Sequence, residues 1–287
     1  MKIRGQRVCQ ACATEWSYYE TGSVACPNCG SLRSVGRDDD RQLHTDTPAA
    51  LSLAQFQAQI AAEPVAEYAA DLKAVLREYT RKRGFINGGE LQPLDDRYLT
   101  ARTLLHTVDI LARRREPTTD AELYLLSLYE TLTDDAAGAA SDAADAETAV
   151  RDVDGGDNGD TAVDTETAGT DAVDAVDADD AHSTELTAAQ VPSELQEAWG
   201  LAAADAVDAY CSDLRTWLDA TPDDAAATTL SQLRDHVNRL NALQGDVEPA
   251  VATDVVESAR AVGRYLRTGD DDALTAARDR LRRLAQA

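Results

Sequence analysis

The chain has 287 residues, and its 52 acidic residues outnumber its 27 lysines and arginines, which gives a formal net charge of −25. Three of these cations are lysines, and 36 of the acids are aspartates. An acidic excess with few lysines is typical of proteins from a salt-saturated cytoplasm, where a Debye length of about 3 Å screens self-repulsion. Binding of a basic partner is the alternative interpretation of the acidity.

No run of about 18 apolar residues occurs, so the sequence predicts no transmembrane helix. The first residues lead directly to cysteines without an apolar segment, so we expect no signal peptide. Paired thiols in a chain of this kind favour a metal site over disulfides, and we expect a cytoplasmic protein.

Four of the five cysteines form two C-x-x-C pairs, Cys9 with Cys12 and Cys26 with Cys29, and thirteen residues separate the pairs. Two residues between thiols let both sulfurs of a pair face one ion, and a hairpin can bring the pairs together. The spacing therefore predicts a tetrahedral zinc site with these four cysteines as its ligands. A module of under about 40 residues buries too little apolar surface to fold alone. Structural zinc contributes about 10–16 kcal/mol to such folding.

The residues around the cysteines predict a small β module over 1–37. The segment 14–19 is strand-prone because it carries aromatic residues and Thr14. Gly22 supplies a turn, and 31–35 is expected to be the last strand. Pro27 and Gly30 suit a tight turn whose backbone N–H groups point at thiolate sulfur.

The segment C-P-N-C-G at 26–30 is the knuckle found in zinc ribbons and rubredoxin-like sites. The module at 1–37 resembles a zinc ribbon of the transcription factor B type. The run W-S-Y-Y-E-T-G-S, followed by C-P-N-C-G-S-L-R-S-V-G, resembles an uncharacterised family of haloarchaeal zinc-ribbon proteins, which implies no activity. Ala13 follows the first pair where a symmetric knuckle has Gly, so we expect a less regular first turn. The gap between the pairs is much shorter than in rubredoxin, which disfavours an electron-transfer iron site.

The N-terminal module is locally basic, with five cations and two acids over 1–37. Trp16, Tyr18 and Tyr19 could stack nucleic-acid bases if they are exposed. The alternative is that these aromatic residues pack in the module's own core. Phosphate attraction weakens steeply with salt, so a feebly basic module would bind nucleic acid poorly in a salt-rich cell.

The segment 38–50 is polar and predicts a tether, and His44 within it is expected at the surface. Apolar residues at helical spacing then predict a helical unit over 51–132. Cationic clusters at 81–83 and 113–115 are typical of helix C-termini, with a basic patch as the alternative for the first. The expected helices are a short one that passes Phe56 and Ile60 and stops near Pro64, then 65–83, 95–115 and 118–132, with a loop at 85–94.

The segment 133–185 is predicted to be a disordered acidic linker, because low hydrophobicity with high charge prevents a packed core. Between 134 and 185 it holds 17 acids and one arginine. A D-G-G-D-N-G-D run at 154–160 lacks the rest of a calcium loop.

Apolar stripes return over 186–287 and predict a second bundle of four helices. Cys211 lies on one of these stripes and is expected to be a buried small hydrophobe. His106 falls in a predicted helix and is expected to be an ordinary interior or flanking residue. His236 falls in another without a carboxylate or thiol partner. The arginines near the end of the chain suit the C-terminus of a helix.

The sequence thus predicts a mainly α protein: a small N-terminal β zinc ribbon at 1–37 and two helical units at 51–132 and 186–287, joined by the acidic linker. We expect a non-catalytic zinc-binding protein whose ribbon is a structural recognition module and whose helical units bind a protein partner. A nucleic-acid-binding or transcription-machinery accessory is the alternative. An enzyme is the third hypothesis, and no catalytic residue can be named for it. Four thiolates also leave no open coordination position at the metal, which disfavours catalysis there.

Overall fold

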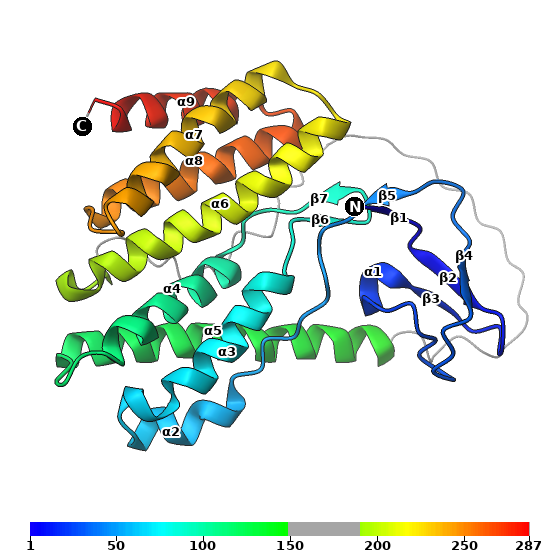
Figure 1. Ribbon diagram of the computed structural model, residues 1–287, viewed down its shortest axis with the longest axis horizontal. Helices are drawn as coiled ribbons and strands as arrows, with labels where there is room; N and C mark the ends of the chain where they lie inside the picture. Colours follow the sequence, from blue (N-terminus) through cyan, green and yellow to red (C-terminus); the bar gives the residue numbers. More distant parts are fainter. Residues whose placement is uncertain (149–189, 287) are drawn as a thin grey trace, which may run out of the picture.

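The computed structural model describes residues 1–148 and 190–286, with the backbone alone over 135–148. The described chain is mainly helical, with a small β module at the N-terminus, which confirms the predicted fold class (Figure 1). The predicted linker covers 133–185, and its part from 149 onward, with the D-G-G-D-N-G-D run at 154–160, lies outside the described residues.

The N-terminal module is built on a three-stranded antiparallel sheet of order β3-β2-β4. The central strand is β2, Gln6–Cys9, which pairs with β3, Glu15–Ser17, and with β4, Ser34–Gly36. Arg7 faces Trp16 on one side and Gly36 on the other. The sheet positions both cysteine pairs, because β2 ends at Cys9 and the second pair precedes β4.

The predicted strand over 14–19 is shorter in the structure, and a one-turn helix, α1 (Tyr18–Thr21), replaces its end. The hydroxyl of Ser17 accepts a hydrogen bond from the backbone N–H of Tyr19 at 3.2 Å and caps this turn. Gly22 then ends it with φ 61°, a conformation that glycine adopts readily. Strand propensity is overridden here by local capping.

The segment predicted as a polar tether packs between the β module and the helices. β1, Lys2–Ile3, pairs antiparallel with β5, Gln42–Leu43. His44 was predicted at the surface, and this prediction is wrong, because its side chain is 3% exposed. Its Nδ1 accepts a hydrogen bond from the N–H of Gly88, and its ring lies 4.9 Å from that of Tyr19.

The first group of helices follows the expected stripes. Asp95 caps α4 by accepting a hydrogen bond from the N–H of Tyr98 at 2.7 Å. The predicted loop at 85–94 contains a small hairpin, β6–β7, with Gly88 and Gly89 in its turn at positive φ. The elements of this part are η1 (Ala54–Phe56), α2 (Gln57–Ala62), α3 (Val65–Lys82), β6 (Ile86–Asn87), β7 (Glu90–Leu91), α4 (Asp96–Leu111) and α5 (Thr119–Thr148).

α5 continues to Thr148, well past the end predicted at 132. The residues that prolong it are rich in alanine, the best helix former. Propensity therefore prolongs the helix into a stretch for which charge and low hydrophobicity predicted a linker.

The second group contains four long helices, as predicted. Asp223 and Asp270 cap α7 and α9 through their carboxylates, and Gly269 ends α8 with φ 74°. The elements are η3 (Ser193–Leu195), α6 (Gln196–Ala220), α7 (Asp224–Ala242), α8 (Pro249–Thr268) and α9 (Asp271–Leu284). No helix in the described ranges is long and apolar enough to cross a membrane.

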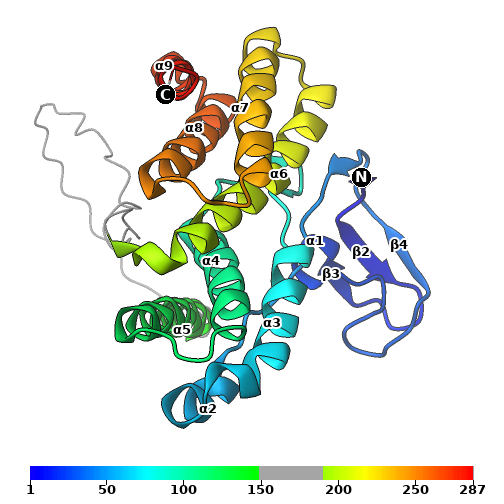
Figure 2. The same cartoon turned by 60° about the vertical axis from the view of Figure 1, so that its left-hand side comes forward.

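The two predicted helical units share one hydrophobic core. α4 packs against α3 and α5 on its own side of the sequence and against α6 across the predicted linker. Phe85 lies at this junction, with its ring edge-on to Tyr98 and Tyr210 at centroid distances of 5.0 and 4.8 Å. The helical part is therefore a single packed body. The β module lies at its side (Figures 1 and 2).

Asp213 on α6 joins three parts of the chain. Its Oδ2 accepts hydrogen bonds from the N–H of Phe85 at 2.6 Å and from the hydroxyl of Thr45 at 2.7 Å. It therefore connects the segment after β5, the segment after α3 and the second group of helices.

We expect Asp213→Ala to lower the free energy of unfolding by about 2 kcal/mol, because hydrogen bonds to a charged group are lost and two donors lose their acceptor. Urea unfolding measures the change. Asp208→Ala, an exposed position on the same helix, is the control and should change stability by less than about 0.5 kcal/mol. Equal effects of the two variants would show that this link contributes nothing specific.

Candidate metal centre

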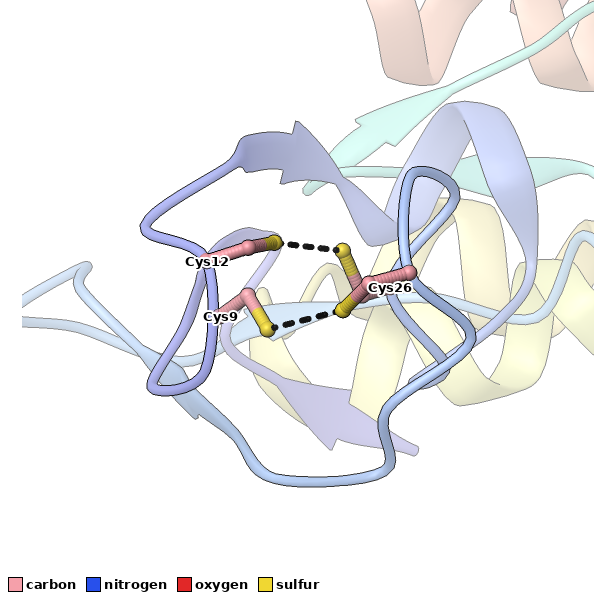
Figure 3. Close-up of side chains that lie close together, drawn as sticks. Cys9, Cys12 and Cys26 are labelled. Atoms are coloured by element: carbon pink, nitrogen blue, oxygen red, sulfur yellow. Dashed lines mark hydrogen bonds between the residues drawn. The ribbon is translucent and has the colours of Figure 1, made fainter.

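The four cysteines predicted as ligands lie together in the structure. Their sulfurs are all within 4.8 Å of one another. The Sγ atoms of Cys9 and Cys29 are 3.6 Å apart, and those of Cys12 and Cys26 are 3.5 Å apart. Figure 3 shows the side chains of Cys9, Cys12 and Cys26 directed toward one another. Cys9 and Cys26 are buried, whereas Cys12 and Cys29 face solvent.

This geometry fits a tetrahedral zinc ion. Zinc–thiolate bonds of about 2.3 Å place the sulfurs of a regular tetrahedron about 3.8 Å apart. The two separations given above are slightly below this value and the others lie within 4.8 Å, so one ion can contact all four sulfurs with small adjustments. The cluster could hold a metal ion in a closed shell of four ligands. Cys211, the fifth cysteine, is buried in α6 as predicted and takes no part.

The two C-x-x-C turns have the same backbone hydrogen bonds. The carbonyl of Cys9 accepts from the N–H of Ala13 at 2.9 Å, and that of Cys26 accepts from Gly30 at 2.9 Å. Each first cysteine also donates its own N–H, at 2.9 Å, to the carbonyl five residues on. Ala13 and Gly30 have φ values of 60° and 69°. The expectation of a less regular first turn is therefore wrong, because Ala13 adopts the left-handed conformation that the turn requires.

We expect Ala13→Gly to stabilise the metal-bound module by roughly 0.5–1 kcal/mol. A left-handed alanine costs about 1–2 kcal/mol, and the added freedom of glycine in the unfolded chain returns roughly 0.4–1 kcal/mol of this. Competition with a chromogenic zinc chelator measures the gain as a several-fold tighter affinity. Ala11→Gly, at an exposed position of the same turn, is the matched control. An affinity gain no larger than the control's would mean that the alanine is not strained.

Hydrogen bonds around the sulfurs favour thiolates. The hydroxyl and backbone N–H of Thr14 lower the pKa of the Cys12 thiol to about 6, and the hydroxyl lies 3.2 Å from the sulfur. The N–H of Ala11, 3.4 Å from the sulfur of Cys9, lowers the pKa of that thiol. Thr14 and Asn28, whose Nδ2 lies 3.8 Å from the Cys12 sulfur, were missed by the sequence analysis. Their closeness in sequence to a cysteine was the available signal.

Cys29 shows why four thiolates need a cation among them. The backbone N–H of Ser31 lowers its pKa, but the neighbouring thiols of Cys12, Cys9 and Cys26, together with burial, outweigh this and raise the pKa to about 12. Like charges this close disfavour joint ionisation. A divalent ion at the centre reverses the effect and keeps all four ligands deprotonated.

The aromatic residues proposed as base-stacking candidates are not free. Trp16 is buried against Cys9 and Cys26 in the module's own small core, and its Nε1 donates to the carbonyl of Ser23 at 3.0 Å. Tyr18 and Tyr19 pack against the His44 ring with centroid distances of 6.0 and 4.9 Å. The structure thus favours the interpretation in which these rings stabilise the module and its contact with the helices.

The cationic clusters at helix ends are engaged in structural contacts. Arg83 forms ion pairs with Asp46 and Asp95, at 3.3 and 3.0 Å. In the second cluster Arg114 pairs with Glu194. The first cluster lies at a helix C-terminus as predicted, because Arg81 and Lys82 are in the last turn of α3. The second does not, because α4 ends at Leu111 and its last turn carries no basic residue. The histidines of the helices lie apart: Nε2 of His106 is 2.9 Å from Asp205, and His236 is on α7.

The fold and the cluster together define a small β module with four clustered thiols that could hold a metal ion, attached to a single helical body. The chain matches a family of unknown function, DUF7117, over residues 1–161 and 164–281, and it belongs to this family. No curated protein and no solved structure matches it.

Proposed function

We propose that the protein is a non-catalytic zinc-binding protein, in which a ribbon of the transcription factor B type serves as a rigid recognition module and the helical body binds a protein partner. The observation that supports this most directly is the four-sulfur cluster with its two matched turns. The acidic composition supports placing this protein in the cytoplasm of a salt-adapted haloarchaeal cell. A reducing compartment keeps the thiols available for metal.

The closed ligand shell supports a structural role for the zinc. A catalytic zinc keeps one coordination position for water or substrate, whereas four thiolates fill a tetrahedral shell. Thr14 and Asn28 contact the Cys12 sulfur, and such outer contacts orient ligands. The proposal therefore assigns the ion to folding of the ribbon and assigns no catalytic residue.

The test is partner recovery in molar salt with the zinc-loaded chain and with a Cys12→Ser/Cys29→Ser variant. These two cysteines are exposed, so the exchange removes ligands without opening a core. We expect protein partners to crosslink to the native chain and those that contact the ribbon to be lost from the variant. Metal analysis should find one zinc per chain. A chain purified without zinc, or identical partners for both proteins, would contradict the role of the ribbon.

A nucleic-acid-binding accessory is the second candidate function. It is favoured by the local positive charge of residues 1–37, which hold five cations and two acids. Of these cations, Arg7 already donates to the hydroxyl of Ser34 at 2.9 Å. The buried position of Trp16 weighs against base stacking as its mechanism. Titration of labelled DNA and RNA at molar salt tests it. Binding that persists there and is lost in Arg4→Ala would place this function first.

A further inference from the structure

A large groove lies between α5 and the pair of helices α2 and α3. Its cavity of about 1300 Å³ exceeds the roughly 300–1,000 Å³ of ordinary small-molecule pockets. One wall is the turn between α2 and α3, with Ile60, Pro64 and Val65, and the other is α5, with Leu123 and Leu126. α4 packs against both α3 and α5. Figure 2 shows α2, α3 and α5 in the lower part of the molecule.

The α5 wall presents apolar side chains to solvent. Leu123 is 58% exposed and Leu126 is 37% exposed. Among the described helical segments and their caps, the only other exposed large aliphatic side chain is that of Leu243. Two such leucines one helical turn apart, beside a hollow, indicate an apolar surface that a partner covers.

The rim of the groove is negative. It carries five acidic side chains that form no ion pair within the described part of the chain. The rim also carries two arginines. Arg114 pairs with Glu194, so Arg115 is the remaining positive charge beside the five acids. The acidic residues of the rim are Glu63, Glu116, Glu122, Glu130 and Asp134.

We propose that this groove binds a basic amphipathic helix of a partner protein. An apolar hollow between helices receives the apolar face of a helix through anchors at i, i+3, i+4 and i+7. Lysines and arginines flanking those anchors would meet the acidic rim. The inference deepens the proposed interaction function by naming its surface and the class of partner. It rests on one part of that function, the binding of a partner by the helical body, and not on the role of the ribbon.

Charge decides against the other occupants. The segment from 134 to 185 carries 17 acids and one arginine, so it would place like charge on the rim. A second copy of the chain has a net charge of −25 and the same acidic groove. At molar salt only charges within about 3 Å of one another interact strongly. Like charges in contact at the rim are unfavourable, whereas the cations of a basic helix would pair with the acids there while the helix buries the two leucines.

The test is selection of binders by the full zinc-loaded chain from a displayed library of 18-residue peptides. Each peptide has leucines at helical spacing and charges of either sign on the flanks. We expect basic peptides to be enriched and to bind Leu123→Glu/Leu126→Glu at least tenfold more weakly. Leu243→Glu, at the exposed leucine that follows α7 and does not line the groove, should bind like the native protein. Enrichment of acidic peptides, absence of enrichment, or equal binding by the two variants would overturn the proposal.

Three further measurements complete the test. Sedimentation of the native chain identifies self-association, and a dimer that Leu123→Glu/Leu126→Glu dissociates would make a second copy the occupant and overturn the proposal. Circular dichroism verifies that the groove variant keeps its helices. Binding of the selected peptides to Cys12→Ser/Cys29→Ser distinguishes the two proposals. Unchanged peptide binding by this variant would support the groove proposal independently of the zinc-dependent recognition role of the ribbon.

Discussion

Chelation of zinc is expected to unfold residues 1–37 and to leave the helical body folded. The module's own core consists of Cys9, Trp16 and Cys26, and three side chains cannot offset the conformational entropy of a chain of this length. A structural zinc ion supplies about 10–16 kcal/mol to folding in such sites. The helical body has a separate and much larger core, so its stability does not depend on the ion.

Hydrogen exchange measured by mass spectrometry before and after chelation checks this expectation. Amides of β2, β3 and β4 should lose protection, while those of α4 and α6 keep it. The β1–β5 pair is the informative boundary, because it holds the N-terminus against Leu43 and Gln42 next to the hairpin at Gly88 and Gly89. We expect this pair to fray with the module.

Cys211→Ala is the control for metal loss by cysteine replacement. The Cys211 thiol is buried in α6 outside the four-cysteine cluster, and burial raises its pKa to about 12. The Cys211→Ala variant should therefore keep one zinc per chain. Cys9→Ser should lose the ion and reproduce the exchange pattern of chelation. Protection in β2 and β3 that survives complete removal of metal would show that the module folds without it.

The grouping of the four cysteines was predictable because its signal is local. Two C-x-x-C pairs define the candidate ligand set, and the segment between them, which holds β3 and α1, only has to bring them together. The conformation of Ala13 was not predictable in the same way, since its φ of 60° is imposed by the hydrogen bonds of the turn. Propensity alone places alanine elsewhere.

The helices were predicted well where periodicity and caps agree, as at Asp95 and Gly269. Two of the features that the sequence did not place depend on distant residues. His44 is buried by Tyr19 and Gly88, which lie far from it in sequence. The common core of the helical body depends on the contact between α4 and α6. These helices are separated in sequence by the acidic segment, so no local sequence pattern predicts their contact.

Phe85→Ala is expected to destabilise the whole helical body in one step. Phe85 is almost fully buried, and its ring meets Tyr98 of α4 and Tyr210 of α6 edge-on. Replacing a buried phenylalanine by alanine costs about 3–5 kcal/mol, a large part of a typical total of about 5–15 kcal/mol. For a body of this size, each kcal/mol corresponds to roughly 2–4 °C, so the midpoint should fall by about 6–20 °C.

The distribution of the loss is the decisive part of this prediction. Because α4 and α6 share the cavity that the missing ring would leave, the amides of α3 and of α8 should lose protection equally. Two independent helical domains would instead show a loss confined to residues 51–132, which would contradict the single core. Leu32→Ala is the control, because it removes a side chain that is 74% exposed on the β module. It should change the free energy of unfolding of neither group of helices by more than about 0.5 kcal/mol.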